Sequence, residues 1–121
     1  MWQVTSIEDL KTGDITEANG ELYYMFQRTV IVLYYKRPDT TDGMARYIAH
    51  FDLTEPDSIG MGPFRYYSTG EGNLANQEKI VPLGSLHIFG IYESYTTFSL
   101  QQSKQKITLT SDYARIELRK Y

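Results

Sequence analysis

The sequence predicts an all-β protein: an antiparallel up-and-down β-barrel of about eight strands, formed by residues 1–121 as a single domain. Short runs of β-branched and aromatic residues alternate with polar turns, and no long helical period occurs. Tyrosine, which favours strands, is abundant, with 11 Tyr against one Trp. The chain also begins and ends in strand-like sequence, so its first and last strands can pair and close the sheet.

The first third of the chain reads as strand, turn and strand. Residues 2–6 form the first predicted strand, after which Ser6 is suited to N-cap a helical turn that Gly13 would end. Residues 21–36 form an aromatic and β-branched run that is too long for one typical strand. Polar residues 27–29 interrupt this run, which predicts a bend or bulge, or a division into two strands.

A hairpin is predicted next, with a loop over residues 37–43 that leads into a strand over residues 44–54. The second strand alternates strictly, and a slip of one residue would exchange its two faces. The face expected to be buried consists of Ala45, Tyr47, Ala49, Phe51 and Leu53. The face expected to be wetter consists of Met44, Arg46, Ile48, His50 and Asp52.

The next part of the chain carries weaker signals. Residues 55–63 are predicted to form a loop, and residues 64–68 a short strand. Residues 69–79 are predicted to form a long polar connection, and residues 79–93 contain interrupted strand material. Pro82 cannot donate a hydrogen bond to a central ladder. The last of these segments is therefore expected to form an edge, a bend or a rim.

Three strands in sequence end the chain, over residues 94–101, 104–111 and 113–121. The last strand is expected to pair with its predecessor on one side and with residues 2–6 on the other, which would close the barrel. Its inward row is predicted to be Ala114, Ile116 and Leu118. Its outward row is predicted to be Arg115, Glu117 and Arg119.

Composition and charge exclude several classes of function. The net charge is −3, with 12 basic and 15 acidic residues interspersed, so no basic stripe points to nucleic acid. The chain has no Cys, which excludes disulfides, a thiolate nucleophile and a Cys-based zinc site. No run is apolar enough to span a membrane, and no signal peptide is visible. These features fit a cytoplasmic protein or a chain that starts after a removed leader, and the strand-like start at Met1-Trp2 favours the second.

Residues 89–121, "FGIYESYTTFSLQQSKQKITLTSDYARIELRKY", resemble the ending of lipocalin-like, calycin-type domains found in secreted lipoproteins of Bacteroidetes. The opening "WQV" is similar to the first, Trp-bearing strand of lipocalins. Two departures stand out: no Gly precedes Trp2 by two residues, and "SDY" at 111–113 lies too near the end for the lipocalin loop motif. The resemblance implies a barrel with an inner cavity, and Trp2 at its closed end beside Arg119 or, second, Arg115.

The resemblance also implies an exported protein of the periplasm, outer membrane or cell surface. Contact with the membrane would then run only through a lipid on a Cys upstream of this chain. The oligomeric state stays open.

Two histidines are the candidates for reactive chemistry. His50 and Asp52 share one strand face, and His87 could supply a third metal ligand or a base. A plain polar strand face explains the same residues, and neither spacing nor number is typical of a metal site. No nucleophile elbow or phosphate-binding glycine loop is present. We therefore expect no catalytic residue, no tightly bound metal and no cofactor.

The aromatic residues provide the leading functional hypothesis, the non-catalytic binding of a small, partly apolar ligand inside the barrel. In each Tyr-Tyr pair one ring points inward, where it either lines a pocket or simply fills the barrel. The candidate ligand-binding residues are Tyr24, Phe26, Tyr47, Phe51, Tyr67, His87 and Tyr95. The alternative is a structural or protein-interaction module with a filled barrel. A hydrolase or metal-dependent enzyme that uses His50 and Asp52 is third.

Overall fold

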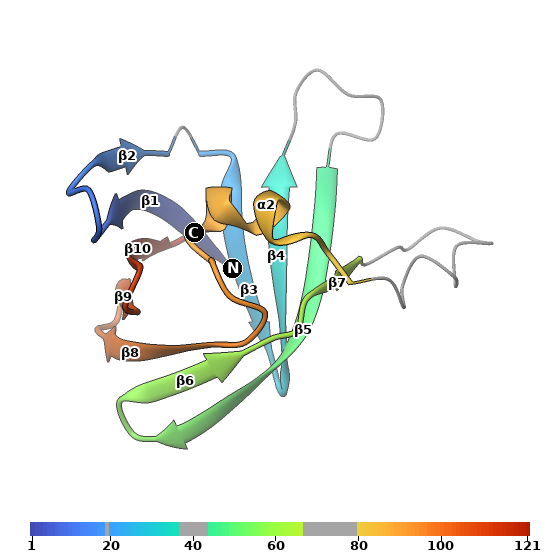
Figure 1. The fold of residues 1–121 in the computed structure, drawn as a ribbon. Helices are drawn as coiled ribbons and strands as arrows, with labels where there is room; N and C mark the ends of the chain where they lie inside the picture. The colour runs from blue at the N-terminus through green and yellow to red at the C-terminus, as the bar shows by residue number, and fades with distance from the viewer. Residues whose placement is uncertain (19, 37–43, 67–79) are drawn as a thin grey trace.

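The computed structural model describes residues 1–18, 20–36, 44–66 and 80–121, and within them the chain folds as an antiparallel β-barrel (Figure 1). The strands are β1 (Trp2–Asp9), β2 (Ile15–Glu17), β3 (Leu22–Gln27), β4 (Val30–Lys36), β5 (Met44–Glu55), β6 (Ser58–Met61), β7 (Arg65–Tyr66), β8 (Thr96–Gln102), β9 (Lys106–Thr110) and β10 (Ala114–Lys120). A short helix, α2 (Leu83–Leu86), leads directly into a 3-10 turn, η1 (His87–Phe89). Two expected segments, the loop 37–43 and the connection 69–79, lie outside the described residues.

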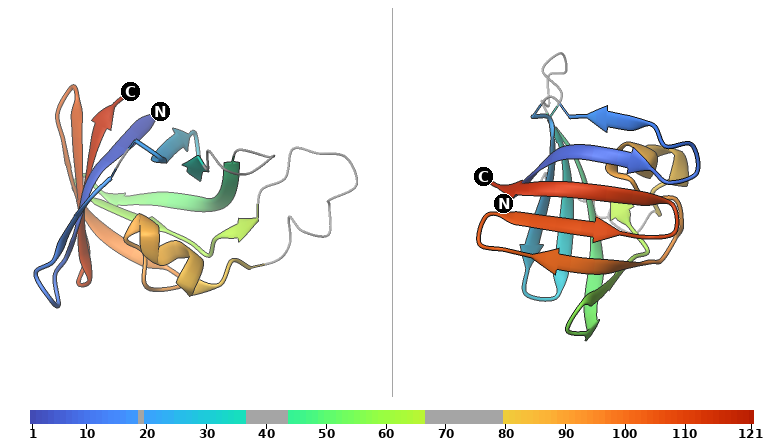
Figure 2. Two further views of the ribbon diagram at one scale, coloured as in Figure 1. Left: turned by 90° about the horizontal axis from the view of Figure 1, so that it is seen from above. Right: turned by 90° about the vertical axis from the view of Figure 1, so that its left-hand side faces the viewer.

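Eight of these strands close the barrel, in the order β1-β3-β4-β5-β6-β8-β9-β10 and back to β1, while β2 and β7 lie beside it. Closure comes from antiparallel pairing of β1 with β10, which runs from Trp2↔Lys120 to Asp9↔Ala114. The two chain ends consequently lie side by side, as Figure 2 shows. The predicted barrel and its closure by the first and last strands are confirmed.

The last strand has the two faces that its alternation predicts. β10 bonds to β9 on one side and to β1 on the other. Ala114, Ile116 and Leu118 are fully buried, whereas Arg115 and Arg119 are exposed and Glu117 is half-buried. The pairing leaves neither edge of β10 open to another chain.

The hairpin of β4 and β5 is also confirmed, with the register Val30↔His50 to Lys36↔Met44. Tyr47 and Ala49 are buried, and His50 and Asp52 are exposed on the other face. The inward row is less buried toward its end: Phe51 is half-buried, and Leu53 is 63% exposed. The expectation that the whole inward face is buried is therefore wrong at Leu53, because the row leaves the core there.

The first strand continues through the predicted helical turn. Ser6 to Asp9 belong to β1 and pair with β10, so the expected turn capped by Ser6 does not form. A β-bulge lies between Val4 and Ser6, and it keeps both Val4 and Ile7 opposite inward residues of β10. Beyond the bulge, β1 pairs with β2. Its pairing with β3 is limited to the start of the strand, at Trp2↔Tyr24 and Gln3↔Tyr23. The barrel wall is therefore split between the second half of β1 and the start of β3.

A cap segment, residues 81–91, plugs the barrel beside this split (Figure 1). Four of its side chains are fully buried: Val81, Leu86, Phe89 and Ile91. Gly90 ends η1 at a positive φ of 81°, and a Cβ there would come within 2.8 Å of Ile116 Cγ1. Glycine thus lets the cap approach β10 closely. Interrupted strand material that forms an edge, a bend or a rim was expected here; a short helix and a 3-10 turn form instead of strand, and their apolar side chains are buried against the barrel.

One further expectation is wrong. Residues 58–61, assigned to a loop from their Gly and Pro neighbours, form β6, which pairs with β5 and β8. Ile59 and Met61 are buried on its inward face, and Gly60 allows the ring of Tyr95 to lie against it. A strand of only four residues forms here because both neighbouring strands supply hydrogen bonds.

Candidate ligand-binding site

The two ends of the barrel carry two open pockets of different character. The cap pocket, of about 500 Å³, lies between the β1–β2 hairpin, the start of β3 and the cap segment. Its lining consists of Ile7, Asp9, Asp14, Thr16, Glu17, Ala18, Glu21, Leu22, Tyr35, His87, Ile88 and Tyr92. The aromatic pocket, of about 220 Å³, opens at the other end of β1 and β3. Its lining consists of Trp2, Phe26, Phe51, Leu53, Ile59, Leu100, Gln102 and Ile107.

The cap pocket exists because the barrel wall is split at this point. Ile7 and Leu22 are inward side chains of β1 and β3 at the point where these strands no longer pair with each other, and both are only half-buried. Tyr35 lies opposite Leu22 in the β3–β4 register and lines the same space. Ile88 of the cap closes the floor and is itself 42% exposed. The result is an apolar surface that solvent can reach.

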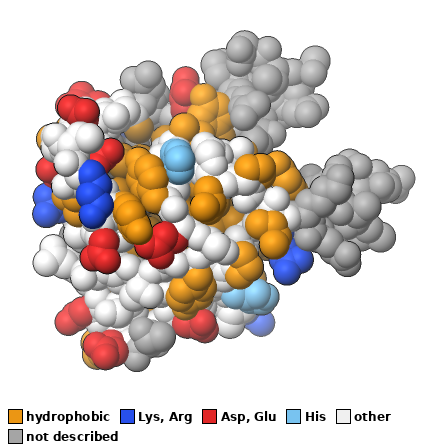
Figure 3. All heavy atoms as spheres, in the orientation of Figure 1, with side chains coloured by type: hydrophobic (Ala, Val, Ile, Leu, Met, Phe, Trp, Pro, Cys, Tyr) orange, Lys and Arg blue, Asp and Glu red, His pale blue; other side chains and the backbone are white. Residues whose placement is uncertain are grey.

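Carboxylates surround this apolar surface. Asp9 and Asp14 come from the β1–β2 turn, Glu17 ends β2, and Glu21 precedes β3. Asp9 holds the turn, since its Oδ1 accepts hydrogen bonds from the backbone N–H groups of Lys11 and Thr12 at 2.8 and 3.2 Å. In Figure 3, hydrophobic side chains occupy the centre of the face that carries α2, and acidic side chains lie at its upper and left margins.

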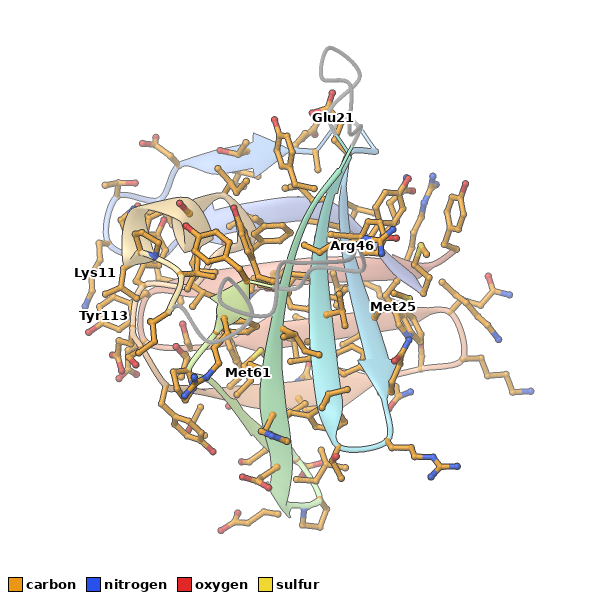
Figure 4. All side chains as sticks on the ribbon, turned by 90° about the vertical axis from the view of Figure 1, so that its right-hand side faces the viewer. Lys11, Glu21, Met25, Arg46, Met61 and Tyr113 are labelled. Atoms are coloured by element: carbon orange, nitrogen blue, oxygen red, sulfur yellow. The ribbon has the colours of Figure 1, made fainter. Side chains whose placement is uncertain are left out.

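Stacked rings join the cap to the turns around the pocket. The imidazole of His87 stacks on Tyr92 with centroids 4.5 Å apart, and Tyr92 lies 5.9 Å from Tyr113. The ammonium of Lys11 lies 5.4 Å from the centroid of Tyr113, and Figure 4 shows this pair together. A side-chain hydrogen bond to Glu93, with that carboxylate's charge, raises the pKa of Tyr113. Lys11 is thus engaged by an aromatic ring and does not line the pocket.

The aromatic pocket lies inside a continuous wall. Phe26 and Phe51 meet edge to face with centroids 5.6 Å apart, and both are half-buried together with Trp2. Gln102 is the one polar residue of this lining. This end of the barrel therefore offers a small apolar recess without charge.

The middle of the barrel is filled and separates the two pockets. Phe89 of the cap lies 6.2 Å from Tyr24 and 6.1 Å from Tyr47, measured between ring centroids. The Tyr24 hydroxyl donates a 2.6 Å hydrogen bond to the backbone carbonyl of Phe89, and burial raises the pKa of that tyrosine. In the described part of the chain, packed side chains of the cap and of the barrel wall thus lie between the two pockets.

The predicted ligand-binding residues are distributed over these regions. Tyr24 and Tyr47 belong to the buried core, Phe26 and Phe51 line the aromatic pocket, and His87 lines the cap pocket. Tyr95 is 44% exposed and covers Gly60 on the outside of β6. Tyr67 lies outside the described residues. Ring contacts therefore link Tyr24, Phe26 and Phe51, whereas His87 and Tyr95 lie in other regions.

The remaining reactive candidates stay apart. His50 is exposed on the outer face of β5 beside Asp52, and His87 belongs to η1. Among the residues that the structure describes, no group of three or more His, Asp or Glu could hold a metal ion.

The expected pairing of Trp2 with a terminal arginine is wrong. Trp2 lines the aromatic pocket, while Arg119 lies opposite Gln3 and donates a 2.7 Å hydrogen bond from Nε to Gln3 Oε1. Arg115 pairs instead with Glu8 at 2.8 Å. Both arginines belong to the outward row of β10, whereas Trp2 points inward.

The sequence did not single out most of the cap pocket. Ile7, Leu22 and Ile88 were not among the predicted ligand-binding residues, and the carboxylates come from separate turns. The exception is His87. The connection between the first two predicted strand runs is polar and acidic. Its carboxylates share a pocket only because the barrel wall is split beside it.

Comparison with known proteins gives a family and two similar structures. The model of a family described as "Lipocalin-like domain" matches residues 1–121. An uncharacterized protein from Bacteroides eggerthii is 20% identical with a TM-score of 0.72, covering 99% of this chain and 96% of that one. A lipocalin-like protein from Bacteroides uniformis is 17% identical with a TM-score of 0.66, covering 99% and 94%. No curated protein matches the chain.

The two structural likenesses support the fold of the barrel. In the described residues, neither helix is long and apolar enough to cross a membrane.

Proposed function

The chain belongs to the family of lipocalin-like domains, and on this premise we propose that it binds a small, partly apolar ligand in the cap pocket without catalysing a reaction. One observation carries the proposal: inward side chains of the barrel become accessible at the split wall and form an apolar surface with a polar rim. A volume of about 500 Å³ lies in the range of small-molecule sites.

The aromatic pocket supports the same function less well. Its volume of about 220 Å³ is below the usual range for a ligand site. Its lining offers one amide and no charge, so it provides little to orient a ligand. We expect it to take at most a single small apolar group.

The test is binding of a neutral fluorescent probe, N-phenyl-1-naphthylamine, followed by methyl NMR. Shifts are expected at Ile7, Leu22 and Ile88 in the cap pocket and not at Leu53 and Leu100. Trp2, the single Trp of the chain, lines the aromatic pocket, so the NMR signal of its indole N–H should stay unchanged. Shifts confined to Leu53 and Leu100 would move the site to the aromatic pocket, and no shift at either end would refute the proposal.

A filling variant makes this test specific. Thr16 is exposed and lines the cap pocket, so Thr16→Trp should lower affinity for the probe about tenfold or more. Thr97 is exposed on β8 opposite Gly60, away from both linings, and Thr97→Trp is the matched control. Equal loss in both variants would contradict a site at the cap.

We further infer that the domain acts outside the cytoplasm, as part of a processed lipoprotein in the periplasm or at the cell surface. The resemblance to secreted lipoproteins of Bacteroidetes supports this, as do the two similar structures from Bacteroides. Mass spectrometry of the protein isolated from its native cells should find a lipidated Cys upstream of Met1. A native cytoplasmic protein without such a Cys would contradict the inference.

A further inference from the structure

The cap pocket combines an apolar floor with charges of one sign. Four of its described lining residues are acidic, namely Asp9, Asp14, Glu17 and Glu21, and none of the described lining residues is Lys or Arg. Its one nitrogen base is His87, which is stacked on Tyr92. Carboxylates beside the apolar surface of the proposed ligand site would favour a positive charge on the ligand.

Two basic side chains near the β1–β2 turn, Lys11 and Arg115, are engaged away from this rim. The ion pairs Lys106–Glu117 and Arg115–Glu8 involve none of the rim carboxylates. Glu8 precedes Asp9 but points to the other face of β1, where Arg115 neutralises it. Lys11, the basic residue of the same turn, lies over the ring of Tyr113. The alternation of β1 thus places the Glu8 carboxylate beside Arg115 on the outer face and the Asp9 carboxylate on the pocket side.

Aromatic rings add to the selectivity. Tyr35 lines the pocket, and an aromatic ring attracts cations most strongly where water is partly excluded, whereas the ring of Tyr92, which also lines the pocket, is stacked on His87. Both tyrosines are half-buried. A cationic head group would thus meet carboxylates at the rim, while an apolar body would contact Ile7, Leu22 and Ile88.

We propose that the cap pocket selects cationic amphiphiles: small molecules with an apolar body and a protonated amine at one end. This rests on the proposed function, since it names the class of ligand for the same pocket. Charge complementarity distinguishes this class from neutral lipids and from fatty acids, whose carboxylate the rim would repel.

The experiment uses three probes with one eight-carbon body: octylammonium, octanol and octanoate. Each is titrated into the protein near neutral pH at low salt, and affinity is read from the methyl signals of Ile7, Leu22 and Ile88. Exposed ion pairs are individually weak, so four carboxylates together should favour octylammonium over octanol by about tenfold. Octanoate should bind most weakly, and high salt should reduce the preference.

A charge-removing variant and its control distinguish the effect of the rim carboxylates from that of the protein's net charge. Glu17→Gln with Glu21→Gln keeps the shape of the rim, and the preference for octylammonium should fall to about threefold or less. Asp52→Asn with Glu55→Gln removes the same charge from exposed positions on β5 outside the cap pocket, and should leave the preference unchanged.

Each result has a defined meaning. Equal affinities for the three probes at the cap pocket, or a preference for octanoate, would overturn the cationic class while leaving the ligand site intact. A preference that falls equally in both double variants would overturn a local role of the rim. The absence of cap-pocket shifts with all three probes would overturn both this inference and the proposed function.

Discussion

The cap pocket and the aromatic pocket are built by the same strands and differ because the wall is paired differently around them. At the aromatic pocket β1 pairs with both β10 and β3, and the recess is a small gap between aromatic side chains. At the cap pocket β1 has left β3 for β2, and the inward residues are exposed to solvent. Loss of a few ladder pairs thus converts core surface into candidate binding surface.

The largest effect is expected from removal of most of β10, which closes the barrel. Deletion of residues 115–121 takes away most of β10, opens the edges of β1 and β9, and removes Ile116 and Leu118 from the core. We expect an aggregating protein, because unpaired edges and apolar surface become exposed. Analytical size-exclusion chromatography and circular dichroism check this. A monomeric truncation that unfolds cooperatively would contradict closure by β10.

The next effect compares one aromatic residue from each region. Phe89 is fully buried at the centre of the barrel, and its change to Ala should cost about 3–5 kcal/mol in the free energy of unfolding. Phe51 is half-buried at the aromatic pocket, and we expect about 1–2 kcal/mol for Phe51→Ala because less surface is lost from the core. Urea denaturation measures both. Equal costs would show that the aromatic pocket is closed in solution.

A change at Gly90 sharpens the comparison by acting on the cap alone. Gly90→Ala places a Cβ against Ile116 and forces a side chain into a positive φ. The strain and the contact together should cost about 2–4 kcal/mol. Affinity for a cap-pocket probe should fall as well, while the Trp2 emission stays that of the native protein. A variant with native stability would show that the cap does not approach β10 so closely.

The smallest expected effect concerns the packed residues that separate the two pockets. Tyr24→Phe removes the hydrogen bond to the Phe89 carbonyl and should cost about 0.5–1.5 kcal/mol near neutral pH. Burial raises the pKa of Tyr24, so its neutral form stabilises the fold below the ordinary tyrosine pKa, and this contribution is lost as pH rises above that value. The stability of Tyr24→Phe should therefore fall less steeply in strong alkali. Parallel alkaline curves for the two proteins would place Tyr24 in contact with water.

The sequence predicts the paired regions well and the split region poorly, for a physical reason. In β10 the alternation of Ala114, Ile116 and Leu118 is enough, since burial of one face fixes both register and neighbours. At Ser6 a local capping signal suggested a helical turn, but the ladder with β10 prevailed. The cap has no periodicity long enough to read, and its apolar residues are buried only after the barrel exists.

The candidate site residues differ in the same way: those in paired strands could be predicted, and those at the split could not. Phe26 and Phe51 could be found as candidates because inward aromatic rings are visible in the strand pattern. Glu17 and Glu21 could not be assigned to one site, because they acquire a shared pocket only where β1 separates from β3.

Intermolecular NOEs between bound octylammonium and the protein test the central claim most directly. If the cap pocket is the ligand site, the alkyl protons should show NOEs to the methyl groups of Ile7, Leu22 and Ile88, and none to those of Leu53 and Leu100. NOEs to Leu53 and Leu100 alone would place the ligand in the aromatic pocket and contradict the assignment of function to the split in the barrel wall.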